Sequence, residues 1–218
     1  SGSTINIVSK ADGIKSDNED ISKSEIKITS GTFDITAYGD AISSASNINI
    51  LDGSFKLVAG DGNTNTDETS AKGIKSATDM SLHNGTYLIT SKDDSIHSNG
   101  VLTIFNGIYH LYAKDDGIHS DDVLNIYDGT INVMESYEGL EGKDINIMGG
   151  IIELVASDDG INATGDANNS NANPPFGDRP EGAEPPNGMG EPPLDGMREP
   201  PNGDIPQDGM NRPPIEQN

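Results

Sequence analysis

A repeat of about 22 residues runs through the first 165 residues and limits what this chain can fold into. Each copy is marked by a residue pair whose second member is Ile or Leu, and these second members are 28, 32, 22, 22, 22 and 21 residues apart. The pairs are Gly13-Ile14, Ala41-Ile42, Gly73-Ile74, Ser95-Ile96, Gly117-Ile118, Gly139-Leu140 and Gly160-Ile161. A fixed period of this length is typical of a solenoid, in which each repeat contacts only its neighbours.

Within each repeat, apolar residues alternate with polar ones on both sides of a second glycine. These glycines are Gly31, Gly53, Gly85, Gly107, Gly129 and Gly150. Apolar residues at positions i and i+2 indicate half-buried strands rather than helices. With the strand at the marker pair, each repeat holds three short strands and three tight turns. The sequence therefore predicts an all-β fold, a right-handed parallel β-helix solenoid of about seven coils over residues 1–165. Both ends of the sequence look cut, so we expect a piece of a longer helix.

Equivalent side chains of successive coils should lie about 4.8 Å apart and stack on one another. One predicted core column contains Ile28, Ile50, Leu82, Ile104, Ile126 and Ile147. A second contains the aromatic residues Phe33, Phe55, Tyr87 and Tyr109, for which we expect core packing rather than ligand binding. Two longer spacings predict polar loops near residues 17–24 and 60–70.

The C-terminal part of the chain has a different composition. All 12 prolines lie between Pro174 and Pro214, among many Gly and Asn residues. Such a segment has too few apolar side chains to form a core. We expect residues 166–218 to be a disordered, low-complexity linker or insertion, with a partner-binding polyproline segment as the alternative.

The charge of the chain excludes some partners. A net charge of −23 with a pI near 4.1 argues against binding to nucleic acid or to an anionic membrane. No apolar run reaches membrane-spanning length, and there are no cysteines to form disulfides. We expect a monomer that is not inserted in a membrane.

A column of charged residues precedes the marker pairs. It consists of Asp12, Asp40, Lys72, Asp94, Asp116, Glu138 and Asp159, with a further aspartate at positions 93, 115 and 158. Like charges on adjacent strands destabilise the pairing unless a counter-ion, a shared proton or solvent compensates them. Because Ca²⁺ takes six to eight oxygen ligands, the pattern predicts bound calcium. The alternative is a solvated acidic turn, in which aspartate is favoured by turn geometry alone.

Three short motifs in this region resemble those of a known group of proteins. They are Asp-Asp-Ser-Ile-His at 93–97, Asp-Asp-Gly-Ile-His at 115–119 and Asp-Asp-Gly-Ile-Asn at 158–162. They are similar to the calcium motif of polysaccharide lyase family 9. They are more similar to a non-catalytic relative, the clostridial carbohydrate-binding β-helix family that binds cellulose and acidic sugars.

The resemblance implies two calcium sites. The first would use Asp93, Asp115 and Asp116, and the second would use Glu138, Asp158 and Asp159. Asp94 of the charged column and His119, which stands where the lyases have a third aspartate, complete the candidate metal ligands: Asp93, Asp94, Asp115, Asp116, His119, Glu138, Asp158 and Asp159. Since His is a poor calcium ligand, we expect His97 and His119 to orient carboxylates or a bound sugar, or else to be exposed turn residues.

An outward column of His83, Phe105 and Tyr127 is the predicted carbohydrate-binding surface. The expected function is a calcium-binding, non-catalytic module of a secreted or bacterial cell-surface protein that recognises cellulose or acidic, pectin-like polysaccharide. One alternative is a calcium-dependent pectate-type lyase, with Lys92, Lys114 or Lys143 nearest to act as its base. Another is a structural adhesin or spacer.

Overall fold

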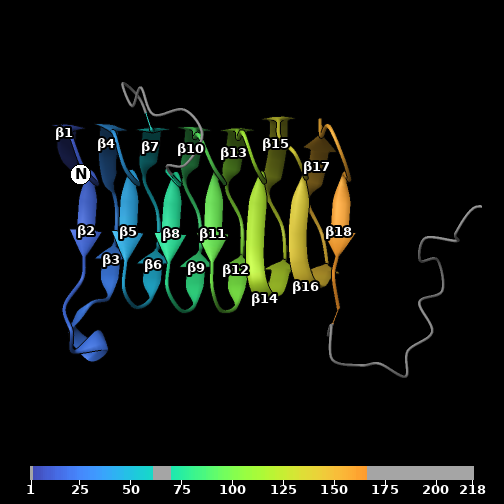
Figure 1. Cartoon of the computed structure of the whole chain (residues 1–218), viewed down its shortest axis with the longest axis horizontal. Helices are drawn as coiled ribbons and strands as arrows, with labels where there is room; N and C mark the ends of the chain where they lie inside the picture. The colour runs from blue at the N-terminus through green and yellow to red at the C-terminus, as the bar shows by residue number, and fades with distance from the viewer. Residues whose placement is uncertain (1, 61–69, 166–218) are drawn as a thin grey trace, which may run out of the picture. The chain divides into compact units, whose positions relative to one another are not determined.

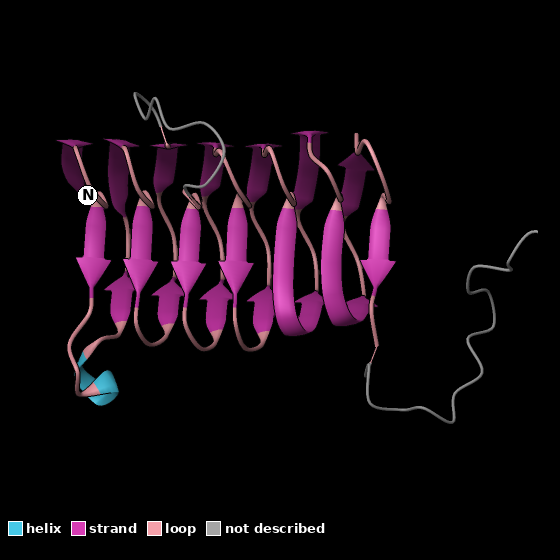
Figure 2. Cartoon of the chain, viewed as in Figure 1, coloured by secondary structure: helices cyan, strands magenta, loops and turns pink. Residues whose placement is uncertain are grey.

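A computed structural model describes residues 2–60 and 70–165, which form a parallel β-helix. Successive coils lie side by side, so that each strand pairs in parallel with its equivalent one coil away (Figures 1 and 2). In the register, Ile42 pairs with Ile74, and Ile96 pairs with Ile118. The predicted fold class is therefore confirmed. The expected loop at 60–70 and the expected disorder of 166–218 fall almost entirely outside the described residues.

The coil has three faces. The first face is formed by β1 (Ser3–Ser9), β4 (Gly31–Ala37), β7 (Ser54–Ala59), β10 (Thr86–Thr90), β13 (Ile108–Tyr112), β15 (Thr130–Glu135) and β17 (Ile151–Leu154). The second is formed by β2 (Ile14–Ser16), β5 (Ile42–Ser44), β8 (Ile74–Ser76), β11 (Ile96–Ser98), the first parts of β14 (Ile118–Ile126) and β16 (Leu140–Ile147), and β18 (Ile161–Ala163). The third is formed by β3 (Ile26–Ile28), β6 (Ile48–Ile50), β9 (Met80–Leu82), β12 (Leu102–Ile104) and the second parts of β14 and β16.

Two coils depart from the predicted pattern of three separate strands. In β14 and β16 the chain stays paired as it turns from the second face to the third. The register between these two strands shifts between Ser120 and Val123, since Gly142 and Asp144 are one residue closer together in the sequence. This shift accounts for the shorter, 21-residue spacing of the last repeat. The predicted loop near 17–24 is present and contains a short 3₁₀ turn, η1 (Ile21–Lys23), capped by Asp20.

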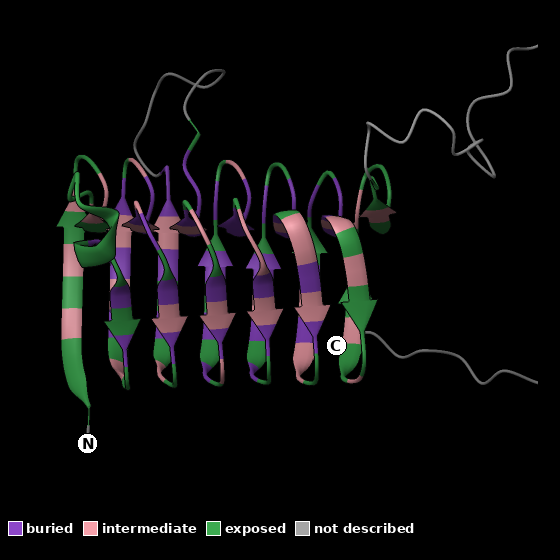
Figure 3. Cartoon of the chain, turned by 90° about the horizontal axis from the view of Figure 1, so that it is seen from below, coloured by how far each residue is buried: buried purple, intermediate pink, exposed green. Residues whose placement is uncertain are grey.

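The interior is built from the predicted columns. Ile50, Leu82, Ile104 and Ile126 are fully buried, and the rings of the aromatic column stack 4.6–4.8 Å apart with nearly parallel planes. Figure 3 shows buried bands in the middle coils, whereas the outer strands β1, β17 and β18 are intermediate or exposed. For that reason the prediction for Ile147 was wrong: it is 45% exposed, because no further coil among the described residues covers it.

A buried column of serines also holds successive coils together. Ser44, Ser76, Ser98 and Ser120 each donate a hydrogen bond to a carbonyl oxygen of the preceding coil, over 2.5–2.8 Å. Ser98→Ala should lower the free energy of unfolding by about 1 kcal/mol, because it leaves the Thr78 carbonyl without the donor that the buried Ser98 hydroxyl supplies. Urea denaturation would measure this, with Ser81→Ala on the outer side of β9 as a control. Equal losses for the two variants would contradict the role assigned to Ser98.

Candidate functional site

The charged column lies at the corner between the first and second faces, and its carboxylates have a structural role that the sequence did not reveal. One oxygen of Asp94 accepts the backbone N–H of Asp116 over 3.1 Å, and one oxygen of Asp116 accepts the N–H of Glu138 over 3.3 Å. In the same way, Asp12 accepts the backbone N–H of Asp40, and Asp40 accepts that of Lys72. Each of these carboxylates therefore links two coils through one oxygen, so turn geometry alone does not explain the column.

Lys72 interrupts the carboxylates and neutralises two of them. Its Nζ lies 2.8 Å from Asp93 Oδ1 and 2.6 Å from Asp94 Oδ2, and all three side chains are largely buried. Burial opposes the charge of Lys72, but Asp94 and Asp93 outweigh it and raise the lysine pKa. Burial likewise opposes ionisation of Asp93, but the hydrogen bond from Lys72 lowers the pKa of that carboxyl. The sequence placed Lys72 in the column but assigned it no function.

Three carboxylates meet beside this lysine. Asp93, Asp94 and Asp115 each offer an oxygen within 4.8 Å of the others. Burial and the charges of Asp116, Asp94 and Asp93 raise the pKa of Asp115. This oxygen-only group contains Asp93 and Asp115 of the first predicted calcium site, together with Asp94. The remaining member, Asp116, lies in a different group.

Two histidines complete the cluster. His97 Nδ1 lies 2.8 Å from Asp94 Oδ2, and its Nε2 lies 3.0 Å from the side-chain oxygen of Asn99. His119 Nδ1 lies 3.1 Å from Asp116 Oδ2 and 3.2 Å from Glu141 Oε2. The two rings are 4.7 Å apart, and both side chains are mostly buried rather than exposed turn residues.

The electrostatic field at His119 is strongly negative. Burial opposes its charge, but the hydrogen bond to Asp116 and the charges of Asp94 and Glu141 raise its pKa to about 9. Burial and the interaction with Asp116 raise the pKa of Glu141 to about 7, although His119 acts in the opposite direction. Repulsion between the carboxylates is therefore not fully offset by the neighbouring cations.

These groups line a hollow of about 280 Å³ in the corner of the helix. Its lining residues are Lys72, Asp94, His97, Asp115, Asp116, His119, Tyr137, Glu138 and Glu141. Five of the nine carry carboxylates and only one is a lysine, so the hollow favours a cation and repels an anion that arrives without one.

The second predicted calcium site does not assemble in the described part of the chain. Glu138, Asp158 and Asp159 form no group of three ligand atoms within 4.8 Å there. Instead, both oxygens of Glu138 accept hydrogen bonds from the side-chain amide of Asn162, over 2.9 and 3.0 Å. Asp158 and Asp159 are exposed on the last described coil.

The predicted sugar-binding column lies on the outside of the helix. The rings of His83 and Phe105 stack 4.5 Å apart, and those of Phe105 and Tyr127 stack 5.3 Å apart. Phe105 and Tyr127 are 38% and 49% exposed. The two stacks cover both faces of Phe105 and one face each of His83 and Tyr127. A sugar ring that stacks needs a free face, and Phe105 at the centre of the column offers only its edges.

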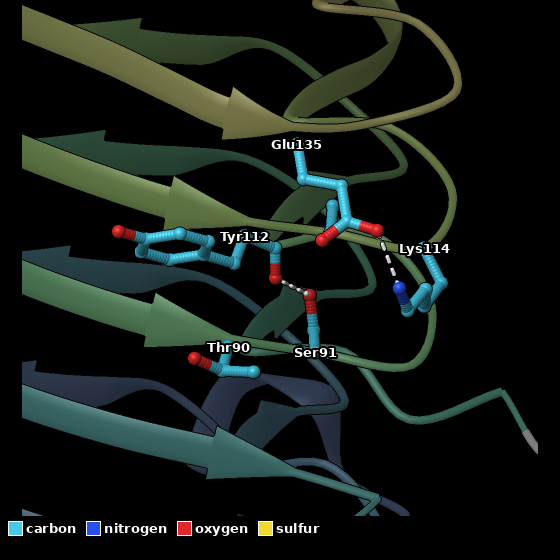
Figure 4. A pocket seen from close by; sticks show the side chains of 6 residues that line it. Thr90, Ser91, Tyr112, Lys114 and Glu135 are labelled. Carbon is cyan, nitrogen blue, oxygen red and sulfur yellow. Dashed lines mark hydrogen bonds and ion pairs between the residues drawn. The ribbon is translucent and has the colours of Figure 1, made fainter. Parts of the chain in front are cut away.

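A second hollow, of about 240 Å³, lies at the end of the first face (Figure 4). It is lined by Thr90, Ser91, Tyr112, Ala113, Lys114 and Glu135. A register shift between β13 and β15 pairs Tyr112 with Glu135, whose carboxylate forms an ion pair with Lys114. The hollow is therefore lined by the partly exposed ring of Tyr112 together with polar and charged groups. Residue spacing does not indicate this hollow, since a bulge of one residue leaves the apolar alternation almost unchanged.

The comparisons with known proteins support one family. A family model described as carbohydrate-binding domain-containing protein matches residues 1–117 and 112–173. No curated protein matches the chain significantly, and no solved structure does. Among the described residues, no helix is long and apolar enough to cross a membrane. Since the match covers most of the β-helix and more than half of the chain, the protein belongs to the carbohydrate-binding domain-containing family.

Proposed function

We propose that this chain is a non-catalytic polysaccharide-binding module of a secreted or bacterial cell-surface protein. Its target would be an acidic, pectin-like plant cell-wall polysaccharide held through calcium, with cellulose as the neutral alternative. The observation that carries the proposal is the family match over residues 1–117 and 112–173, which covers every strand that builds the corner hollow.

The composition of the hollow supports calcium as the bridge. A uronate carboxylate would be repelled by the five carboxylates that line the hollow unless a dication lay between them. The oxygen-only group of Asp93, Asp94 and Asp115 has the donor chemistry that calcium takes, with water or sugar oxygens filling the remaining positions. Lys72 occupies part of this space, so calcium would have to compete with its ammonium.

The lysines favour a binding module over a lyase. Proton abstraction beside a uronate carboxylate requires a neutral base near the metal. In the part of the chain that the structure describes, Lys72 is the only lysine that lines the corner hollow, and its two aspartate partners stabilise the charged form. The hollow is not lined by the three lysines that the sequence analysis named as candidate bases, Lys92, Lys114 and Lys143. Lys114 is instead paired with Glu135.

The test is co-sedimentation of the whole chain with insoluble polygalacturonate and with cellulose, in calcium and in chelator. The proposal expects retention on polygalacturonate that chelator abolishes, without absorbance from unsaturated products. Asp115→Asn should weaken retention, whereas the charge-matched variant Asp144→Asn, at an exposed position on β16, should not. Accumulation of unsaturated product would establish a lyase instead. Failure to bind either polymer would contradict the proposal and favour a structural adhesin or spacer.

A further inference from the structure

The environment of His119 differs from that of a purely structural histidine. His97 has an oxygen acceptor at each ring nitrogen, Asp94 at 2.8 Å and Asn99 at 3.0 Å, so its hydrogen-bonding capacity is filled within the protein. His119 instead points Nδ1 at two carboxylate oxygens at once, at 3.1 and 3.2 Å, from Asp116 and Glu141. One N–H can serve only one of them well. The three atoms belong to one group whose members all lie within 4.8 Å.

These distances match the edges of a metal coordination shell. With metal–ligand distances of about 2.0–2.1 Å, the ligand atoms of a tetrahedral zinc site lie about 3.3 Å from one another. The two separations from His119 Nδ1, 3.1 and 3.2 Å, fall close to this value. The ligands come from two adjacent coils: His119 in β14 pairs with Glu141 in β16, and Asp116 lies just before β14.

A second observation points the same way. His119 Nε2, on the far side of the ring, lies 3.3 Å from Asp121 Oδ1. A carboxylate on the other nitrogen is the usual partner of a metal-binding imidazole, since it selects the tautomer and orients the ring. His119 thus has both the ligand group on Nδ1 and the orienting carboxylate on Nε2.

We infer that His119, Asp116 and Glu141 form a binding site for a transition-metal dication of the zinc type. Imidazole nitrogen is a ligand for such metals, whereas calcium takes oxygen, so this site is chemically distinct from the oxygen-only group of Asp93, Asp94 and Asp115. Three protein ligands leave the fourth position to water or to a sugar hydroxyl from the hollow that all three residues line.

The test is calorimetric titration of the chelator-treated whole chain with ZnCl₂, in a buffer that contains excess calcium. We expect one zinc per chain, about 100-fold weaker binding in His119→Gln, and about 10- to 100-fold weaker binding in Asp121→Asn, which alters only the orienting partner. His110→Gln is the matched control, because His110 lies on the outer side of β13 near Asn132. Bound Co²⁺ should give a tetrahedral visible spectrum that His119→Gln removes.

Glu141→Gln provides a second ligand variant, and circular dichroism in chelator checks the folding of each protein. The site would be overturned by an absence of zinc binding, by equal affinities of His119→Gln and His110→Gln, or by displacement of zinc with equimolar calcium. The assigned ligands would also be overturned if His97→Gln lost zinc binding while His119→Gln kept it. None of these measurements depends on polysaccharide binding, so the two proposals fail independently.

Discussion

Lys72→Met is expected to lower the free energy of unfolding by about 3 kcal/mol in chelator. The substitution keeps most of the side-chain volume but leaves Asp93 and Asp94 buried without their ammonium, and an uncompensated buried charge is strongly destabilising. Lys56→Met is the matched control, because Lys56 pairs with Asp34 over 3.0 Å on the surface, where both side chains are about half exposed. It should cost less than about 1 kcal/mol.

The same pair of variants probes the calcium site. If the ammonium of Lys72 and calcium compete for Asp93 and Asp94, calcium should raise the melting temperature of Lys72→Met more than that of the unchanged protein or of Lys56→Met. Chemical denaturation and thermal unfolding, each with calcium and with chelator, give the two measurements. Equal losses for Lys72→Met and Lys56→Met would show that the buried pair does not matter for folding. An equal calcium effect on all three proteins would contradict the competition.

Tyr87→Ala is expected to lower the free energy of unfolding by about 3–5 kcal/mol. Tyr87 is fully buried between Phe55 and Tyr109, at ring distances of 4.8 and 4.6 Å, so truncation opens a cavity and removes two stacking partners. Tyr87→Phe removes only the hydroxyl that donates to the Asn84 carbonyl and should cost about 1 kcal/mol.

Tyr127→Ala separates burial from aromatic stacking. Tyr127 also stacks on an aromatic neighbour, Phe105, but it is about half exposed, so its loss should cost well under half as much as that of Tyr87. Because coils of a solenoid contact only their neighbours, amide exchange in Tyr87→Ala should quicken most in β7, β10 and β13. Similar costs for Tyr87→Ala and Tyr127→Ala would contradict the distinction between the inner and outer columns.

Much of the candidate site followed from residue spacing. The 22-residue period places Asp94 and Asp116 one above the other, and a period of this kind is visible without coordinates. It does not show how far a long side chain reaches: Lys72 is one member of the column, yet its ammonium contacts Asp93 and Asp94 of the following coil. Nor does spacing distinguish Asp158 and Asp159, which share the sequence motif but lie exposed on the last described coil.

By itself, the sequence determined the coil, the inward columns and the corner at which the carboxylates gather, because these depend only on periods of 22 and of 2 along the chain. The tertiary structure decided which groups in that corner bond to one another. It showed that carboxylates hold the next coil's amides, that Lys72 neutralises two of them, that Glu141 joins Asp116 at His119, and that the outer rings cover each other's faces. The physical reason is that a period sets the positions of Cα atoms, whereas hydrogen bonds and ligand groups depend on the directions of side chains from neighbouring coils.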